Sequence, residues 1–354
     1  MDSKPLQHIP IDPSNRRTLL RHAPTPAETE QPPRLPVKET RGHPSGPTGN
    51  EDGSIYFIGT ATTVIEWAGV RILTDPNFLH AGDHVRLGPG VTAQRRTNPA
   101  VDLEQLPGLD CILLSHFHED HFDKKVEKVL GRDVPIITTP HAEKCLTDAG
   151  IEGGPFQAVT ALDHFESAML EVTGSDAQRR PVFKVTGMPG KHVPPGPLAL
   201  ANGILGAVPP TNGWLLELGH SKDGEPQPRD VSTGFRIYIS GDTLYIDDIF
   251  KDVAKWLEGQ QIDLMLVHLG GTTIPGPKAP LVMVTMDAKQ GVKMMKLMDP
   301  EVTIPIHYDD YDVFLSPLED FQKEVQQAGL QDKVVYLDRG DQYRFSVRND
   351  SHSG

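Results

Sequence analysis

Continuous apolar runs, rather than alternating ones, predict the buried strands of this chain. They lie at 111–115, 134–139, 262–268 and 302–307. A strand that is covered on both faces carries apolar residues at successive positions, whereas a strand with one face in water alternates. Segments with helical spacing fill the gaps between the runs. The pattern therefore predicts an α/β protein whose central strands lie beneath helices.

Shorter β-rich runs open the folded region at 54–76, where GTA and AG separate them and predict a β-meander with tight turns. The next segment, 78–110, is a long connection that carries Gly and Pro. Long connections in compact domains are often functional, so we expect this one to be an active-site lid. Helices are predicted at 287–299 and at 316–329, where Ser316 is the expected N-cap.

The N-terminal segment differs from the rest of the chain. Residues 1–53 are rich in Pro, Thr, Glu and Arg and show no strand or helix periodicity. Such a segment cannot build a core of its own, so we expect an arm that is either disordered or extended across the folded domain. The folded domain is expected to span 54–347 and to be followed by a short tail, 348–354.

Composition narrows the partners and the compartment. The chain has 34 Lys and Arg residues against 48 Asp and Glu, a formal net charge of −14, which argues against nucleic acid as a substrate. Cys111 and Cys145 are too few for a disulfide framework. No apolar leader and no stretch long enough for a membrane span are visible. We expect a cytoplasmic protein that acts on a small molecule, and a homo-oligomer is compatible with the sequence.

Ligand-type side chains are concentrated directly after the first apolar run. The segment SHFHEDHFD, 115–123, holds three histidines and three acidic residues. His116 and His118 are two residues apart, so an extended backbone directs both imidazoles to the same side. Asp120 and His121 follow on the turn, so this elbow can offer one pair of ligands to each of two metal ions. A solvated polar turn is the alternative, but it would be a costly arrangement at the end of a buried strand.

The order H-x-H-x-D-H resembles the signature of the metallo-β-lactamase superfamily, and the resemblance extends over nearly all of 54–347. It implies a four-layer αββα sandwich, with two β-sheets flanked by helices. It also implies a third histidine, a bridging aspartate and a final histidine at later strand ends. His192 in MPGKHVPPGP, Asp242 in ISGDT and His307 in VTIPIH stand at the matching places.

The resemblance implies two metal sites with one shared carboxylate. One site would comprise His116, His118 and His192, and the other Asp120, His121 and His307, with Asp242 bound to both. Two divalent ions about 3.5–4 Å apart would hold a bridging water, lower its pKa towards 7 and polarise the scissile bond. Asp120 and Asp242 would then take part in catalysis as ligands. His-rich sites favour Zn²⁺, with Mn²⁺ or Fe²⁺ as alternatives.

Four further residues are candidates for roles beside the metal ions. His268 ends the third apolar run and could line the pocket or donate to substrate, or it could be a core histidine. Tyr308 is a candidate donor to the oxyanion or leaving group. Asp75 resembles the family's aspartate that supports the ligand histidines, and Asp123 resembles the acid that often follows the motif. A turn-former and a helix N-cap are the alternatives for these two aspartates.

The wider sequence around these motifs resembles the branch that contains L-ascorbate-6-phosphate lactonase and N-acyl-phosphatidylethanolamine phospholipase D. Val193 stands where the phospholipase usually has an aromatic residue, and Asp309, Asp310 and Asp312 would disfavour an anionic phosphate. The first interpretation is therefore a hydrolase in which a metal-bridging hydroxide attacks the carbonyl of a small lactone, cyclic carbamate, lactam or ester. A phosphodiesterase of the phospholipase D type is the alternative. A non-catalytic binding protein would show ligand loss, and no ligand is missing.

Overall fold

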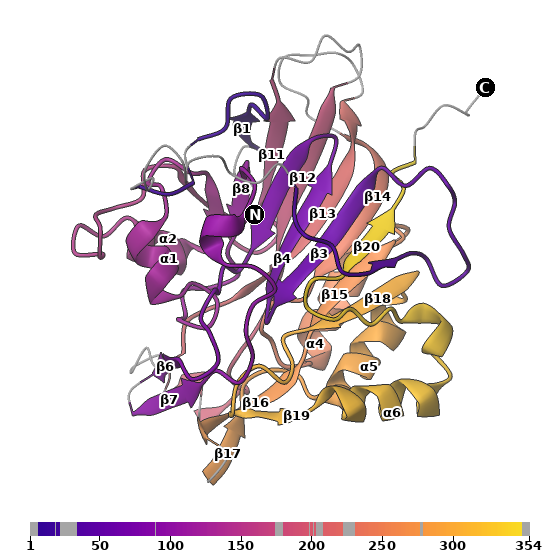
Figure 1. Ribbon diagram of the computed structural model, residues 1–354. Coiled ribbons are helices and arrows are strands. Elements are labelled where there is room, and N and C mark those ends of the chain that lie inside the picture. Colours follow the sequence, from indigo (N-terminus) through magenta and orange to yellow (C-terminus); the bar gives the residue numbers. More distant parts are fainter. Residues whose placement is uncertain are drawn as a thin grey trace.

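The structure is a computed structural model, and it describes residues 6–17, 19–21, 34–88, 90–173, 180–197, 199–200, 202, 208–221, 231–276 and 279–348. Two β-sheets lie face to face, and helices cover the outer side of each sheet (Figure 1). This confirms the predicted four-layer αββα sandwich. Of the predicted C-terminal tail, only Arg348 is among the described residues.

The first large sheet contains the predicted β-meander. β3 (Gly53–Gly59), β4 (Thr62–Trp67) and β5 (Val70–Thr74) pair antiparallel in sequence order. The first two apolar runs form β8 (Cys111–Leu113) and β9 (Ile136–Thr138), which run parallel to β5. Three short strands complete the sheet: β2 (Thr40–Arg41), β10 (Val159–Ala161) and β20 (Gln342–Phe345).

The second large sheet combines an antiparallel group with the other two apolar runs. The antiparallel group is β11 (Ser167–Val172), β12 (Pro181–Pro189), β13 (Asn212–Ser221) and β14 (Val231–Ile239). The apolar runs form β15 (Leu264–His268) and β18 (Val302–Ile306), and both run parallel to β14. The carboxyl ends of β14, β15 and β18 therefore meet at one edge of the sheet.

An edge strand of this sheet comes from the N-terminal arm. β1 (Gln7–Ile11) pairs in parallel with β11. The periodicity of the sequence does not predict this strand, because only Ile11 of its side chains is fully buried. The strand forms because its backbone pairs with β11, a segment that lies far away in the sequence.

Opposite faces of the buried strands contribute to two different cores. On β15, Leu264 and Leu266 point into the core between the two sheets, whereas Met265 and Val267 pack beneath the outer helices. This is why the run is apolar at successive positions. Helices α4 (Asp247–Trp256), α5 (Ala288–Met298) and α6 (Leu318–Ala328) cover this sheet, while α1 (Lys124–Val129) and α2 (Pro140–Leu146) cover the other.

The start of α6 differs from the prediction. Ser316 does not cap α6: its hydroxyl accepts the N–H of Ala288, the first residue of α5, at 3.1 Å. The N-cap position of α6 is Pro317, which makes no side-chain cap. The serine oxygen thereby satisfies a buried N–H of a different helix, a partner that local sequence cannot reveal. Gly329, with φ +68°, ends α6 in the left-handed conformation.

Smaller elements surround the edge at which the parallel strands end. Within the predicted lid, β6 (His84–Gly88) and β7 (Val91–Gln94) form a hairpin. A small sheet and two short 3₁₀-helices complete the described elements: β16 (Gly270–Gly276), β17 (Ala279–Met283), β19 (Phe314–Ser316), η1 (Leu103–Gln105) and η2 (Gln331–Lys333). Among the described residues, no helix has the length and apolar character that a bilayer crossing requires.

Candidate metal centre

The strands deliver the candidate ligands to one edge of the sandwich. β12 runs parallel to β14 because each pairs antiparallel with β13. His192 follows β12, Asp242 follows β14, and His307 follows β18. The elbow 115–123 follows β8 in the facing sheet. Ligands that lie far apart in the sequence therefore converge because their strands share a direction.

The structure brings all seven predicted ligand residues together in two groups. The ligand atoms within each group lie within 4.8 Å of one another. One group comprises His116, His118 and His192, and the other comprises Asp120, His121, Asp242 and His307. All seven are buried except His118, which is half-buried. The division is the one that the sequence predicts, except that Asp242 falls geometrically with the second group.

In the three-histidine group, the outer ring nitrogens are held by the protein. His192 Nδ1 donates to the Val284 carbonyl at 2.9 Å, and His116 Nδ1 lies 2.9 Å from the Ser115 hydroxyl. The Nε2 atoms of His192 and His116 therefore face each other at 3.1 Å. Two imidazole nitrogens directed at one point, with their opposite nitrogens occupied, form a suitable site for a cation.

In the second group, several buried polar atoms lack a hydrogen-bond partner among the described residues. These are Nε2 of His121, Nε2 of His307 and Oδ1 of Asp120. His307 Nδ1 donates to the Leu269 carbonyl at 3.0 Å, so the unpartnered Nε2 is turned towards the carboxylates. Such atoms are costly to bury unless a further group satisfies them, and one divalent ion would satisfy all three. The residues therefore fit a metal ion on their own chemistry.

The two groups differ in the protonation of their histidines. Burial lowers the pKa of His118 to about 4 and that of His116 well below its usual value. Burial alone would also lower the pKa of His121, but the charges of Asp242 and Asp120 outweigh it and raise this pKa well above its usual value. The pKa of His307 is raised for the same reason, against burial and mainly by Asp242.

We expect the second group to lose its metal ion at a higher pH than the three-histidine group. Because the pKa values of His121 and His307 are raised, protons compete with a metal ion for these imidazoles at a higher pH than in the three-histidine group. His118 stays neutral until about pH 4, so its group meets less competition. Metal stoichiometry after equilibrium dialysis at a series of falling pH values should drop in two steps. Release of both ions in a single step would contradict this expectation, and a His121→Ala variant should lack the first step.

Asp75 supports ligands of both groups. Its Oδ1 accepts the backbone N–H of Ser115 at 2.7 Å and the Ser115 hydroxyl at 2.9 Å. The same hydroxyl contacts His116 Nδ1, while Asp75 Oδ2 lies 3.6 Å from His121 Nδ1. Asp75 therefore orients His116 through Ser115 and faces His121 directly. In the sequence, the role of Ser115 is indicated only by its position immediately before the histidine motif.

Asp242 is held by two neighbours. His268 Nδ1 lies 3.0 Å from Asp242 Oδ1, and Thr285 donates its hydroxyl to Oδ2 at 3.1 Å. Both neighbours are fully buried. His268 therefore positions a candidate ligand through Nδ1. Its contact with substrate stays a prediction, because its Nε2 has no partner among the described residues. Thr285 was not predicted, because it lies in a segment with no recognisable motif and meets Asp242 only through the fold.

Tyr308 is not part of the site, which corrects its prediction as a catalytic donor. Its hydroxyl donates to the Leu337 carbonyl at 3.1 Å, and its ring packs 6.3 Å from that of Phe57. Burial raises the pKa of this phenol. His307, with φ +60°, turns the backbone so that the tyrosine points into the core while the histidine faces the ligands.

Asp123 is a helix cap and does not contact the ligand imidazoles. Its Oδ1 accepts the N–H of Val126 at 2.8 Å, and its Oδ2 accepts that of Phe78 at 2.5 Å. None of its hydrogen bonds within the described part of the chain reaches a metal-ligand candidate. The prediction that it supports the ligands is therefore corrected in favour of the N-cap alternative.

Asp123→Ala is expected to destabilise the fold by about 2–3 kcal/mol, because two buried N–H groups lose their acceptor. The metal stoichiometry should not change. Urea unfolding followed by fluorescence, together with elemental analysis, checks both statements. Loss of metal from a variant that is still folded would return Asp123 to a role beside the ligands.

The acidic triplet after His307 is occupied by structural contacts. Asp310 is fully buried between two arginines, with Oδ1 at 3.5 Å from Arg95 and 2.5 Å from Arg339. Asp312 accepts the backbone N–H of Gln94 at 2.9 Å. Because two arginines compensate the charge of Asp310, this carboxylate does not repel an anion at the ligands in the way that the sequence suggested.

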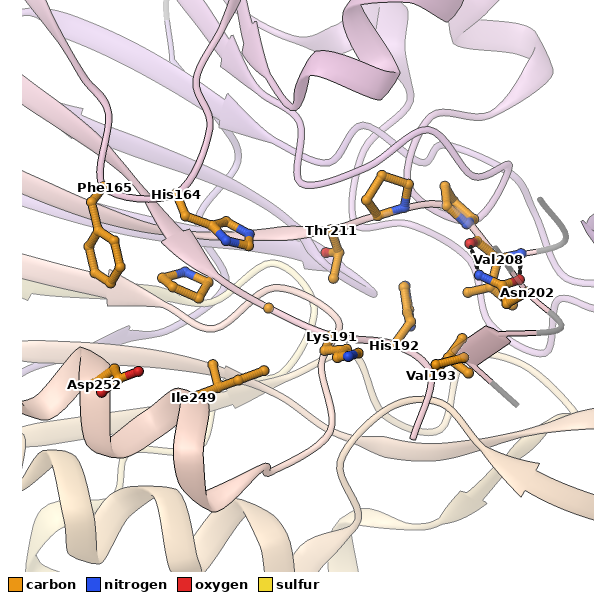
Figure 2. A pocket seen from close by; sticks show the side chains of 15 residues that line it. His164, Phe165, Lys191, His192, Val193, Asn202, Val208, Thr211, Ile249 and Asp252 are labelled. Carbon is orange, nitrogen blue, oxygen red and sulfur yellow. Dashed lines mark hydrogen bonds between the residues drawn. The ribbon is translucent and has the colours of Figure 1, made fainter. Parts of the chain in front are cut away.

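Two cavities adjoin the ligand residue His192. A small one of about 20 Å³ is lined by four ligand residues and by Leu87, Val208, Thr272, Ile274, Val284 and Thr285. Leu87 lies on β6, so the predicted lid does reach the site. A larger cavity of about 620 Å³ shares His192 and Val208 with the small one (Figure 2). Substrate can therefore lie in the larger cavity and present one bond to the ligands.

Comparison with known proteins agrees with this geometry. The family model described as "Beta-lactamase superfamily domain" matches residues 70–308, more than half of the chain. A UPF0173 metal-dependent hydrolase from Archaeoglobus fulgidus is 28% identical over 293 residues, which cover 82% of this chain and 99% of that protein. An N-acyl-phosphatidylethanolamine-hydrolyzing phospholipase D of Caenorhabditis elegans is 25% identical over 303 residues, 82% of this chain and 76% of that protein.

Among solved structures, the isothiocyanate hydrolase from Delia radicum gut bacteria is similar in fold. Its TM-score is 0.61 at 19% identity, and the match covers 83% of this chain and 99% of that one. At this identity the likeness concerns the fold alone. Together, the family match, the curated relatives and the two His/Asp groups identify the chain as a member of the metallo-β-lactamase superfamily and as a metal-dependent hydrolase.

Proposed function

We propose that the protein hydrolyses a small molecule at an uncharged carbonyl group, in a lactone, cyclic carbamate, lactam or ester. The observation that carries this proposal is the lining of the small cavity. Besides the four ligand residues it contains apolar side chains and two threonines, and no Lys or Arg occurs among its described lining residues. An uncharged reacting group suits such walls, whereas a phosphate would lack a protein cation at this point.

The proposed centre holds two divalent ions, for which Zn²⁺ is the first candidate and Mn²⁺ or Fe²⁺ the alternatives. When bound, such ions supply a hydroxide nucleophile from water near neutral pH and polarise the substrate oxygen. The protein holds the ligands in place: Ser115 orients His116, while His268 and Thr285 fix Asp242. Asp120 Oδ1 has no partner among the described residues, so it is available as a ligand to the ion of the second group.

A panel of substrates tests the proposal. The metal-loaded protein would be assayed with lactones, cyclic carbamates, lactams, aryl esters, an aryl isothiocyanate and bis-aryl phosphodiesters. We expect at least one uncharged carbonyl substrate to be cleaved about 100-fold faster than any phosphodiester, which corresponds to about 2.7 kcal/mol in the barrier. Asp242→Asn is the control for contaminating activity. Faster cleavage of the phosphodiesters would overturn the choice of bond.

A phosphodiesterase of the phospholipase D type is the second candidate, and one observation favours it. A further cavity of about 310 Å³ is lined by His118 together with Arg86 and Lys124, which could bind an anionic group. Glu119 and Glu127 line the same cavity and reduce its positive charge. The similarity to the phospholipase D of C. elegans supports the same candidate at the level of family relationship. The phosphodiester arm of the panel separates the two functions.

A further inference from the structure

The larger cavity beside His192 has features of a binding site for the part of the substrate that is remote from the cleaved bond. Its lining includes six apolar residues: Pro189, Val193, Val208, Pro209, Pro210 and Ile249. Its volume of about 620 Å³ is within the range of small-molecule sites. Prolines restrict the backbone, so these walls are largely preformed. An apolar group of the substrate would be buried here next to the ligands.

An aromatic side chain is held at the rim of this cavity. Phe165 is 37% exposed and has φ +65°, a conformation that is rare for a bulky residue. Its ring lies 5.6 Å from the ring of Trp256 on α4. Figure 2 shows Phe165 and His164 at one end of the cavity and Val193 and Val208 at the other. A strained backbone that presents an exposed ring over a cavity points to contact with an aromatic ligand.

Lys191 is the one basic side chain among the described residues that line this cavity, apart from the two histidines. It is half-buried and lies immediately before the ligand His192. Its backbone is fixed on both sides, since its N–H donates to Thr243 Oγ1 at 2.8 Å and its carbonyl accepts from Leu244 at 2.9 Å. Within the described part of the chain, its ammonium forms no ion pair with a carboxylate. A half-buried cation without a partner favours an anionic ligand.

The only carboxylate among the described lining residues is Asp252, which is exposed on α4 near Phe165 (Figure 2). It would repel an anion at that end of the cavity. The anionic group of a bound molecule is therefore directed towards Lys191, at the end of the cavity that adjoins His192. The aromatic part of the molecule is directed towards Phe165.

We propose that the larger cavity binds an aromatic group of the substrate that carries one carboxylate, and that Lys191 pairs with this carboxylate. The inference rests on the proposed function, because it assigns the remote part of the same substrate. The reacting carbonyl stays uncharged in the small cavity. Lys191 is then a specificity residue, and Phe165 is the aromatic contact at the rim.

Two matched esters test the inference by kinetics. One is the acetate ester of a hydroxyphenylacetate, and the other is the acetate ester of the corresponding hydroxyphenylacetamide. Lys191→Met should raise KM for the carboxylate ester about 10-fold, leave its kcat within about 2-fold and leave the amide ester unchanged. Lys191→Arg should retain the preference for the carboxylate. Lys255→Met on the exposed side of α4 is the matched control for a change in net charge, and it should behave as wild type.

Phe165→Asn tests the aromatic contact separately. Asn tolerates a positive φ, so this variant should fold as well as wild type. It should raise KM for both esters by a similar factor of about 5, because the aryl group is common to them. An unchanged KM for both esters would remove Phe165 from the site.

Direct binding separates the failure of this inference from the failure of the proposed function. Each ester is titrated into the metal-loaded wild-type protein and into Lys191→Met, under conditions in which no turnover is seen. Tighter binding of the carboxylate ester that disappears in Lys191→Met supports the cavity assignment even if neither ester is hydrolysed. Hydrolysis with the same KM in wild type and Lys191→Met overturns the assignment while leaving the proposed function intact. Absence of any Lys191-dependent difference in binding overturns it as well.

Discussion

Asp242→Asn is expected to reduce kcat/KM by at least about 1,000-fold and to lower the metal content from two ions to one or none. The carboxylate is buried, and its Oδ2 lies 3.3 Å from His121 Nε2 and 3.5 Å from His307 Nε2. The charges of these two histidines outweigh burial and hold the pKa of Asp242 well below its usual value. An amide of the same size keeps the shape but loses the negative charge that attracts a divalent ion to this group.

Activity assays and elemental analysis of the purified variant check this expectation. Asp320→Asn on α6 is the matched control, since its carboxylate is partly exposed and pairs with Lys323 of the same helix. His268→Ala and Thr285→Val should show intermediate losses of about 10–100-fold, because each removes one support of Asp242. Full activity together with full metal stoichiometry in Asp242→Asn would defeat the assignment of the metal centre.

Exhaustive chelation is expected to abolish turnover and to lower the melting temperature by roughly 10 °C. The metal-free site leaves Nε2 of His121 and His307 and Oδ1 of Asp120 buried without partners among the described residues. An ion present at about 100 times its Kd stabilises the folded state by about 2.7 kcal/mol, and there are two proposed ions. In a domain of about 290 residues, 1 kcal/mol corresponds to about 2 °C.

Differential scanning calorimetry before and after chelation measures this shift, and addition of Zn²⁺ or Mn²⁺ should restore both activity and melting temperature. The Asp242→Asn variant is the control, because it has already lost metal and the chelator should lower its melting temperature less. Unchanged turnover in the chelated wild type would count against a metal-dependent mechanism.

The central strands and the candidate ligands were predictable because their signals are local. An uninterrupted apolar run such as 302–307 records burial on two faces, and β18 was found there. The elbow 115–123 concentrates ligand-type residues at a strand end, so its chemistry is visible in nine consecutive positions. His192, Asp242 and His307 were indicated by their order and by their places at strand ends, through the resemblance to the superfamily.

The errors concern residues whose roles depend on partners distant in the sequence. Tyr308 is next to a ligand in the chain, yet a positive φ at His307 directs it to the Leu337 carbonyl. Asp310 was treated as an uncompensated charge, because Arg95 and Arg339 approach it only in the folded chain.

The sequence by itself determined the central strands and the candidate ligands at 115–123, because apolar periodicity and motif spacing are properties of neighbouring residues. The four-layer fold and the later ligands His192, Asp242 and His307 followed from the resemblance of the sequence to the superfamily. Only the tertiary structure decided that His268 and Thr285 hold Asp242 and that Lys191 lines an apolar cavity. These roles depend on side-chain direction and on contacts across more than twenty positions, or on what surrounds a residue in space. Neither the distant contacts of a residue nor its surroundings in space can be read from the residues next to it in the sequence.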